Sequence, residues 1–204
     1  MSTAAEEAPI ERPRLAALQD GVYAIAMTLL VLELKLPAFG ETFADAALWS
    51  ALLGLWPKLL GLLLSFWVLA LFWESDARIL TAAPRVDAPL LRLAQLRLLL
   101  VSLLPFSSAL IGEHGNHAPA AAVYAGHLML LALIQVIQHL RVRRALADAA
   151  AAGRGLQAWA TLACSAAALG LAFVAPGYNM FALAPILFLR LLQRFRPCRQ
   201  AGKP

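Results

Sequence analysis

Charged residues and cysteines are scarce in this sequence of 204 residues. Asp, Glu, Lys and Arg make up 14% of the chain, whereas a soluble globular domain has about 25%. The two cysteines, Cys164 and Cys198, are too few for a disulfide framework, and we expect both to be unpaired. Hydrophobic residues make up 61% of the chain, and its mean hydropathy is +0.72. These values exclude a soluble domain and indicate an integral membrane protein.

Patterns for catalysis, metal binding and export are absent as well. Ser65 and Ser107 have no acid–base pair in a suitable sequence context. His114, His117 and Glu113 lie in a short connection, where such a set is more often solvated than bound to a metal. The first residues show neither the apolar core nor the cleavage site of a signal peptide. We therefore expect no enzyme, no metal, no cofactor and no cleaved leader.

Six stretches are long and apolar enough to cross about 30 Å of hydrocarbon as α-helices that rise about 1.5 Å per residue. The connections are short and contain turn-forming residues, as in PAFGE, HGNHAP and PGYN. No stretch leaves room for a separate soluble domain, so we predict one all-α transmembrane domain over residues 1–204. The predicted spans are Leu15–Leu36, Leu48–Trp73, Leu90–Ile111, Ala120–Leu140, Leu156–Val174 and Tyr178–Leu192.

The basic residues predict how the chain crosses the membrane. They gather before the first span, in the second and fourth connections and after the sixth span, which places nearly all of them on one side. Under the positive-inside rule that side is cytoplasmic, so we expect both termini in the cytoplasm. The net charge of +5 is then a consequence of orientation, and we expect no nucleic-acid partner.

The first predicted span contains an ionisable residue, Asp20. A charge within hydrocarbon costs at least ~2.5 kcal/mol, and no cation lies three or four residues away on the same helix. A partner must come from elsewhere, either from Arg97 at a comparable depth in the third span or from Arg14 or Arg78. Asp20 is then half of a structural ion pair that fixes helix packing, or a residue of an ion path or gate.

An apolar stripe runs along the same span. At about 100° per residue, Ile25, Leu29, Leu32 and Leu36 lie within about 40° of one line, with the hydroxyl of Thr28 on its shoulder. Such a stripe in a membrane helix most often faces lipid or the protein core. Periodicity alone therefore does not identify a pore.

The motifs resemble those of a known family. Residues 14–34 read RLAALQDGVYAIAMTLLVLEL and resemble the first-helix signature of the bacterial relatives of the lysosomal potassium channel transmembrane protein 175. That signature is R-x-x-x-F-S-D followed by G-V-F-A-I-A-x-T-L-L-V-L-E. LWPK at 55–58 with Ser65-Phe66, and VSLLPFSSALIGE at 101–113, are similar to the second and third helices of this family. The likeness is specific in the first half of the chain and compositional in the second.

The resemblance implies a homotetramer in which four first helices line a central pore without a P-loop filter. The family's constriction falls on Ile25 in this sequence, and its further apolar layers fall on Leu29 and Leu32. Thr28 matches a polar position that the family uses for hydrated potassium. The resemblance thus turns the apolar stripe into a predicted hydrophobic pore lining.

The chain departs from the family pattern in its motif brace. Arg14 and Asp20 are kept, but Leu18 and Gln19 replace the motif's Phe and Ser. The family's histidines after the second helix are missing. Trp73 is present and is followed by Glu74-Ser-Asp76-Ala-Arg78, so we expect Glu74, Asp76 and Arg78 to replace them and Trp73, Arg78 and Arg97 to be candidate brace partners.

The resemblance and the residues together predict a potassium-permeable cation channel of the bacterial inner membrane, whose partners are the potassium ion, membrane lipid and three further copies of the chain. The alternative is a secondary transporter coupled to cations or protons. Transporters are often built from inverted repeats with matching broken helices. The first three spans here do not resemble the last three in charge or motif, which argues against this alternative.

Overall fold

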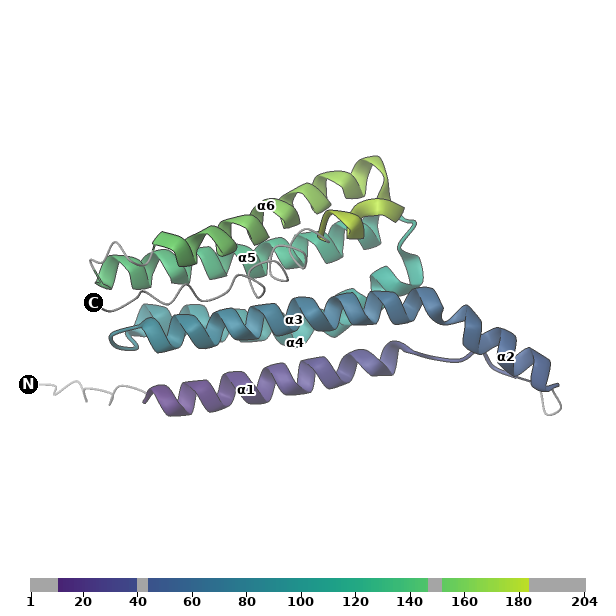
Figure 1. Ribbon diagram of the computed structural model, residues 1–204, viewed down its shortest axis with the longest axis horizontal. Helices are drawn as coiled ribbons and strands as arrows, with labels where there is room; N and C mark the ends of the chain where they lie inside the picture. The colour runs from purple at the N-terminus through teal and green to yellow at the C-terminus, as the bar shows by residue number, and fades with distance from the viewer. Residues whose placement is uncertain (1–10, 40–43, 147–151, 184–204) are drawn as a thin grey trace, which may run out of the picture.

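In the part of the chain that the structure describes, five helical segments are long and apolar enough to cross a membrane. The computed structural model in Figure 1 describes residues 11–39, 44–146 and 152–183, and every regular element within these ranges is helical. The elements are α1 (Arg12–Leu29), η1 (Leu30–Glu33), α2 (Asp45–Gly54), α3 (Trp56–Ala82), α4 (Ala88–His114), α5 (Ala118–Leu146), α6 (Ala152–Val174) and η3 (Pro176–Leu183). The prediction of an all-α multi-pass membrane protein is confirmed at this level.

The first helix is shorter at its far end than predicted. Pro13 lies in the first turn of α1, where a missing N–H costs no hydrogen bond. The chain tightens into the 3₁₀ turn η1 and leaves the helix at Leu34, which has φ −79° and ψ 82°. Pro37 follows, and prolines disfavour helix in the preceding residue. Leu36 therefore lies outside the helix, and its predicted place on the stripe is wrong.

The second predicted span is divided in two. A break at Leu55 separates α2 from α3, and Pro57 occupies the first turn of α3 instead of weakening the middle of a longer helix. In Figure 1, α2 projects past the ends of the other helices. No residue of α2 is buried, whereas α3 packs against α1, α4 and α5.

The third and fourth spans form the centre of the bundle. Asp87 caps α4, because its Oδ1 accepts a hydrogen bond of 3.0 Å from the Leu90 amide. The other carboxylate oxygen of Asp87 lies 3.4 Å from Arg141 at the end of α5. Pro105 lies inside α4, which continues through it. The main core joins α1, α3, α4, α5 and α6 through residues such as Val101 and Leu131, each 0% exposed.

The fifth span packs on the fourth through small side chains. Ala158, Thr161, Ser165, Ala168 and Ala172 form the buried face of α6, and small residues at this spacing allow two membrane helices to approach closely. Figure 1 shows α6 alongside α5 at one edge of the bundle, while α1 lies at the opposite edge. The pore-helix candidate α1 is therefore covered by neighbours on one side only.

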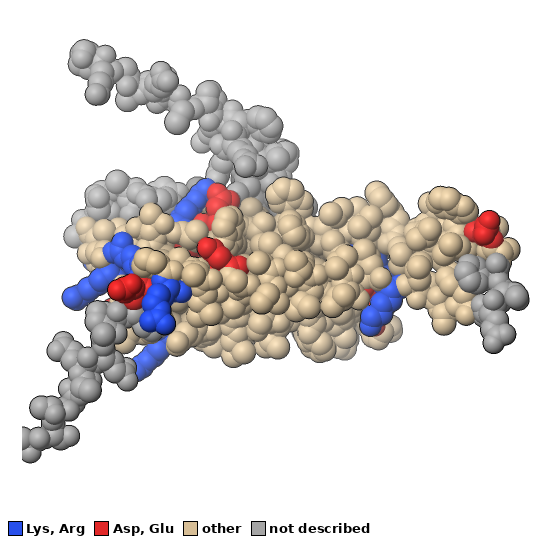
Figure 2. Space-filling model, turned by 90° about the horizontal axis from the view of Figure 1, so that it is seen from below, with Lys and Arg blue, Asp and Glu red and all other residues tan. Residues whose placement is uncertain are grey.

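The sixth predicted span, Tyr178–Leu192, begins in the 3₁₀ segment η3 and otherwise lies outside the described residues. The basic residues of the described chain gather toward one end of the bundle, and Figure 2 shows most blue side chains, with several red ones beside them, near the end where the chain begins. We call this the Arg-rich end; it includes Arg12, Arg78, Arg85, Arg92 and Arg141. Glu33, Lys58 and Glu113 lie at or near the helix ends on the opposite side.

Candidate functional site

The apolar stripe of α1 is not covered by the rest of the chain. Ile25 is 60% exposed, Leu29 40% and Leu32 64%. The opposite face of the same helix is buried, through Leu15, Gln19, Tyr23, Ala26 and Leu30. Met27, which lies between the two faces, packs partly against the core. The helix thus presents a continuous apolar surface to whatever surrounds the single chain.

Thr28 lies on the exposed side beside this stripe. Its Oγ1 donates a hydrogen bond of 2.8 Å to the carbonyl of Ile25, one turn earlier in the helix. The single hydroxyl proton is therefore used within the helix, and the lone pairs of the oxygen remain available to water or to a hydrated cation.

Asp20 is exposed and is bound by an indole rather than by a cation. Nε1 of Trp73 on α3 donates a hydrogen bond of 2.7 Å to its Oδ1. Both residues line a cavity of about 280 Å³ between α1 and α3, whose walls also include Arg12, Gln19 and Thr81. The cavity lies at the Arg-rich end and gives the carboxylate access to water in the single chain.

A buried polar cluster lies on the other face of α1. The hydroxyl of Tyr23 donates a hydrogen bond of 2.7 Å to Oδ2 of Asp76 on α3, and Nε of Arg97 on α4 lies 3.0 Å from the same oxygen. The three residues are 1%, 2% and 0% exposed. The Arg97 guanidinium also lies 5.0 Å from the ring centre of Phe72 and 3.4 Å from the amide oxygen of Gln138.

The arginines that were predicted as partners of Asp20 do not form an ion pair with it in the structure. Arg97 forms its ion pair with Asp76, and Arg78 pairs with Glu74 one helical turn away on the surface of α3. Arg14 is exposed. Of the side chains that the structure describes, Trp73 is the hydrogen-bond partner of Asp20. An ion pair between Asp20 and Arg97 was the wrong expectation, because Asp76 occupies the buried side of Arg97.

Tyr23 was missed by the sequence analysis. The family signature has G-V-F where this chain has Gly21-Val22-Tyr23, so the extra hydroxyl was visible in the motif comparison. Asp76 was expected to replace a missing histidine, but its pairing with Arg97 joins residues of different helices and has no local sequence signal. The available clue to this contact was that Tyr23 adds a hydroxyl, and Asp76 an acid, that the family pattern lacks.

Other polar groups inside the bundle are engaged in packing. His127 Nε2 lies 2.9 Å from the carbonyl of Leu100, so this nitrogen carries the proton and donates; Nδ1 accepts from Ser107 at 2.8 Å. His127 on α5 thus makes both of its ring-nitrogen contacts with α4. Ser65 lies 2.9 Å from Ser108 and 3.1 Å from the hydroxyl of Tyr124.

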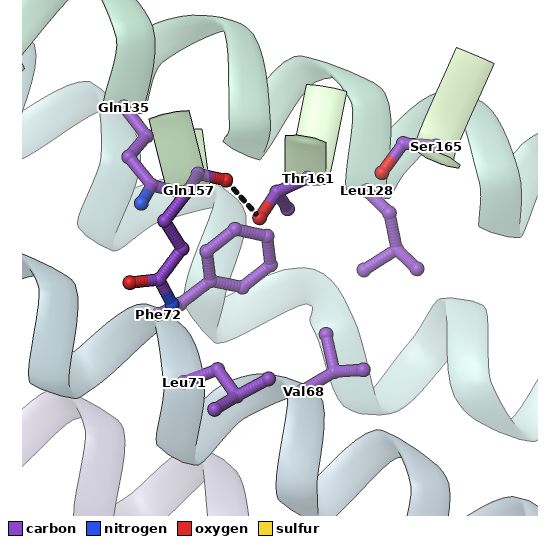
Figure 3. Close-up of a pocket in the computed structure, with 8 residues that line it drawn as sticks. All are labelled: Val68, Leu71, Phe72, Leu128, Gln135, Gln157, Thr161 and Ser165. Atoms are coloured by element: carbon purple, nitrogen blue, oxygen red, sulfur yellow. Dashed lines mark hydrogen bonds between the residues drawn. The ribbon is translucent and has the colours of Figure 1, made fainter. Parts of the chain in front are cut away.

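A second cavity lies between α3, α5 and α6, away from α1, and Figure 3 shows its lining. Its volume is about 10 Å³, which is room for about one water molecule. Thr161 donates to the carbonyl of Gln157 at 2.9 Å along one wall. A space of this size does not form an ion path.

Comparison with known proteins identifies the relatives of this chain. Residues 14–105 match the family described as endosomal/lysosomal potassium channel TMEM175. Similar proteins named as potassium channels occur in Chamaesiphon minutus (40% identical over 127 residues), Streptomyces collinus (34% over 128) and Chryseobacterium sp. (30% over 132). The matches cover 61%, 60% and 64% of this chain and 62%, 60% and 65% of the relatives. The chain thus spans a little over three-fifths of their length.

The fold is similar to a solved structure over a larger part of the chain. The crystal structure of a lysosomal potassium-selective channel TMEM175 homologue from Chamaesiphon minutus matches with a TM-score of 0.78 and 29% sequence identity. The likeness covers 89% of this chain and 97% of that one. The resemblance drawn from the first-helix motif is confirmed, and the family and these relatives are channels rather than enzymes.

Proposed function

Because the chain is a homologue of the TMEM175 potassium channels, we propose that it forms a potassium-permeable cation channel without a P-loop filter. Four copies surround a central pore, and each contributes α1 to its wall. The observation that carries this proposal is the exposed stripe of Ile25, Leu29 and Leu32 on a helix whose opposite face is buried.

The need for several copies follows from the geometry of the stripe. One helix cannot enclose a pore, so several α1 helices must turn their exposed faces to a common axis. Four is the number that the family resemblance implies. The sequence contains no T-V-G-Y-G filter segment, so carbonyl rings of that kind are not available for selectivity.

Ile25 forms the narrowest apolar ring in this arrangement, with Leu29 and Leu32 as further layers. An apolar ring that is narrower than a hydrated ion imposes the free energy of removing or excluding water, and it can close by dewetting. Thr28 lies between Ile25 and Leu29 along the helix and offers oxygen lone pairs to hydrated potassium. Selectivity then depends on width and on this hydroxyl ring.

The membrane placement follows the charges. The Arg-rich end faces the cytoplasm of a bacterial cell under the positive-inside rule, and the membrane is the inner membrane. The secondary transporter remains the alternative activity, and it differs in predicting saturable, coupled flux instead of steady unitary currents.

The test is electrical recording from purified protein in lipid bilayers. The Ile25→Asn variant places four amides at the ring, so cation conductance should rise and potassium preference should fall; each ~1.4 kcal/mol removed from the barrier raises the rate about tenfold. Thr28→Val is nearly isosteric and should reduce potassium preference while the fold is kept. Native mass spectrometry of the same samples should find tetramers.

Met27→Leu is the matched control, because Met27 lies on the same helix but packs partly against the core. It should leave conductance and selectivity unchanged. A change in permeation with Met27→Leu and none with Ile25→Asn would show that a different face of α1 lines the pore. Saturable coupled uptake without unitary currents would favour the transporter.

A further inference from the structure

The buried cluster of Tyr23, Asp76 and Arg97 is not explained by the pore lining itself. It lies on the face of α1 that points away from the stripe, because Tyr23 and Ile25 are separated by about 200° around the helix. It is also the one place where the described part of α1 is bonded to a buried charged pair. Charged groups inside a membrane protein mark functional positions more often than filler.

We propose that Tyr23, Asp76 and Arg97 are positioning residues that set the placement of α1 at the pore axis. The inference rests on the proposed function, since it concerns the helix that lines the pore. In this contact, the hydroxyl of Tyr23 moves together with α1. Asp76 is the fixed side, because Arg97 holds it from α4 while the guanidinium packs on Phe72 and reaches Gln138 on α5.

The hydrogen bond between Trp73 and Asp20 also joins α1 to α3, and the two bonds together oppose sliding of α1 in both directions. Asp20 and Tyr23 lie one turn apart on α1 and bind Trp73 and Asp76, which lie one turn apart on α3. The helices run in opposite directions (Figure 1), so the two hydrogen bonds slope in opposite senses along the membrane normal. Sliding of α1 in either direction therefore lengthens one of them.

Removal of the Tyr23 hydroxyl should free α1 without altering any group that faces the ions. In the Tyr23→Phe variant the barrier between positions of α1 falls, so the mean open and closed dwell times should both shorten at least threefold. The unitary current and the reversal potential in mixed potassium and sodium should stay as in the unmodified channel. Phenylalanine occupies this place in the family signature, so the fold accommodates it.

Tyr124→Phe provides the matched control. Tyr124 is also buried, and its hydroxyl is bonded to Ser65, but it lies on α5 and not on the pore helix. Both variants lose one buried hydrogen bond and should lose thermal stability to a similar degree. Only Tyr23→Phe should change the dwell times.

Hydrogen exchange measured by mass spectrometry on the tetramer in lipid nanodiscs gives a readout that needs no current. Amides of residues 18–26 should exchange faster in Tyr23→Phe than in the unmodified protein or in Tyr124→Phe. If the protein passes no unitary currents, the channel proposal fails while this comparison still tests the positioning role. Unchanged dwell times and unchanged exchange in Tyr23→Phe, with stability lowered as in Tyr124→Phe, would overturn the inference.

Discussion

At the scale of single residues, the chain treats its two intramembrane aspartates differently. Asp20 is exposed and accepts one hydrogen bond from an indole, whereas Asp76 is 2% exposed and pairs with a guanidinium that is 0% exposed. A buried charge that loses its partner costs far more free energy than an exposed one, because water cannot replace the partner. We therefore expect the pair of Asp76 and Arg97 to contribute more to stability than Asp20 does.

Arg97→Gln should lower the melting temperature of the detergent-solubilised protein strongly, because it leaves Asp76 buried without a cation. The loss corresponds to about 3–5 kcal/mol. Adding Asp76→Asn to this variant removes both charges, keeps an acceptor for Tyr23, and should restore much of the stability. Asp20→Asn should cost about 1 kcal/mol or less, since the amide oxygen can still accept the hydrogen bond from Trp73.

Arg78→Gln serves as the comparison for this series. Its ion pair with Glu74 lies on the surface of α3, where such pairs contribute about 0.3–0.5 kcal/mol. The melting temperature should barely change. If Arg78→Gln and Arg97→Gln destabilise equally, burial is not what distinguishes the two arginines.

At the scale of elements, α6 packs on α5 through small side chains, whereas α1 has one buried face and one exposed face. Ala168 is 0% exposed in the interface with α5, while its neighbour Ala167 is exposed. Ala168→Leu should therefore lower thermal stability by about 1–3 kcal/mol, since added methylenes have no space in a packed interface. Ala167→Leu adds the same volume on the other face and should be close to neutral. Circular dichroism melting curves of both variants measure the difference.

The helices themselves could largely be read from the sequence. Four of the predicted spans each correspond to one helix of the structure, and their ends differ by a few residues. Long apolar runs with polar connections permit few alternatives. The break at Leu55 was not predicted, because the long apolar run was taken as one span, although Gly54 before it and Pro57 after it are signals of a helix boundary. Helical periodicity placed Ile25, Leu29 and Leu32 on one face of α1 but left open whether that face is buried or exposed.

The polar contacts could not be read in the same way. Tyr23 and Asp76 are 53 residues apart, so their contact depends on how α1 and α3 are placed side by side. Sequence spacing defines neighbours within one helix only. The partner of each buried charge could therefore not be predicted without the relative positions of the helices.

At the scale of the whole molecule, the number of crossings determines where the chain ends. An even number of spans places both termini on one side, and an odd number places them on opposite sides. We expect green fluorescent protein fused to either terminus to fluoresce in the bacterial cytoplasm, because Tyr178–Leu192 is predicted to cross the membrane. Fluorescence from the N-terminal fusion alone would show that this segment does not cross.

The ion pair between Asp76 and Arg97 has a consequence for biosynthesis. The two charges sit near the same end of neighbouring helices, α3 and α4, which are joined only by residues 83–87. A charge at the membrane centre opposes the insertion of a single helix by roughly 2.5–3.5 kcal/mol, and a charge nearer the helix end opposes it less. We expect α3 and α4 to enter lipid together as a helical hairpin, because the pair between Asp76 and Arg97 removes this opposing free energy from both helices.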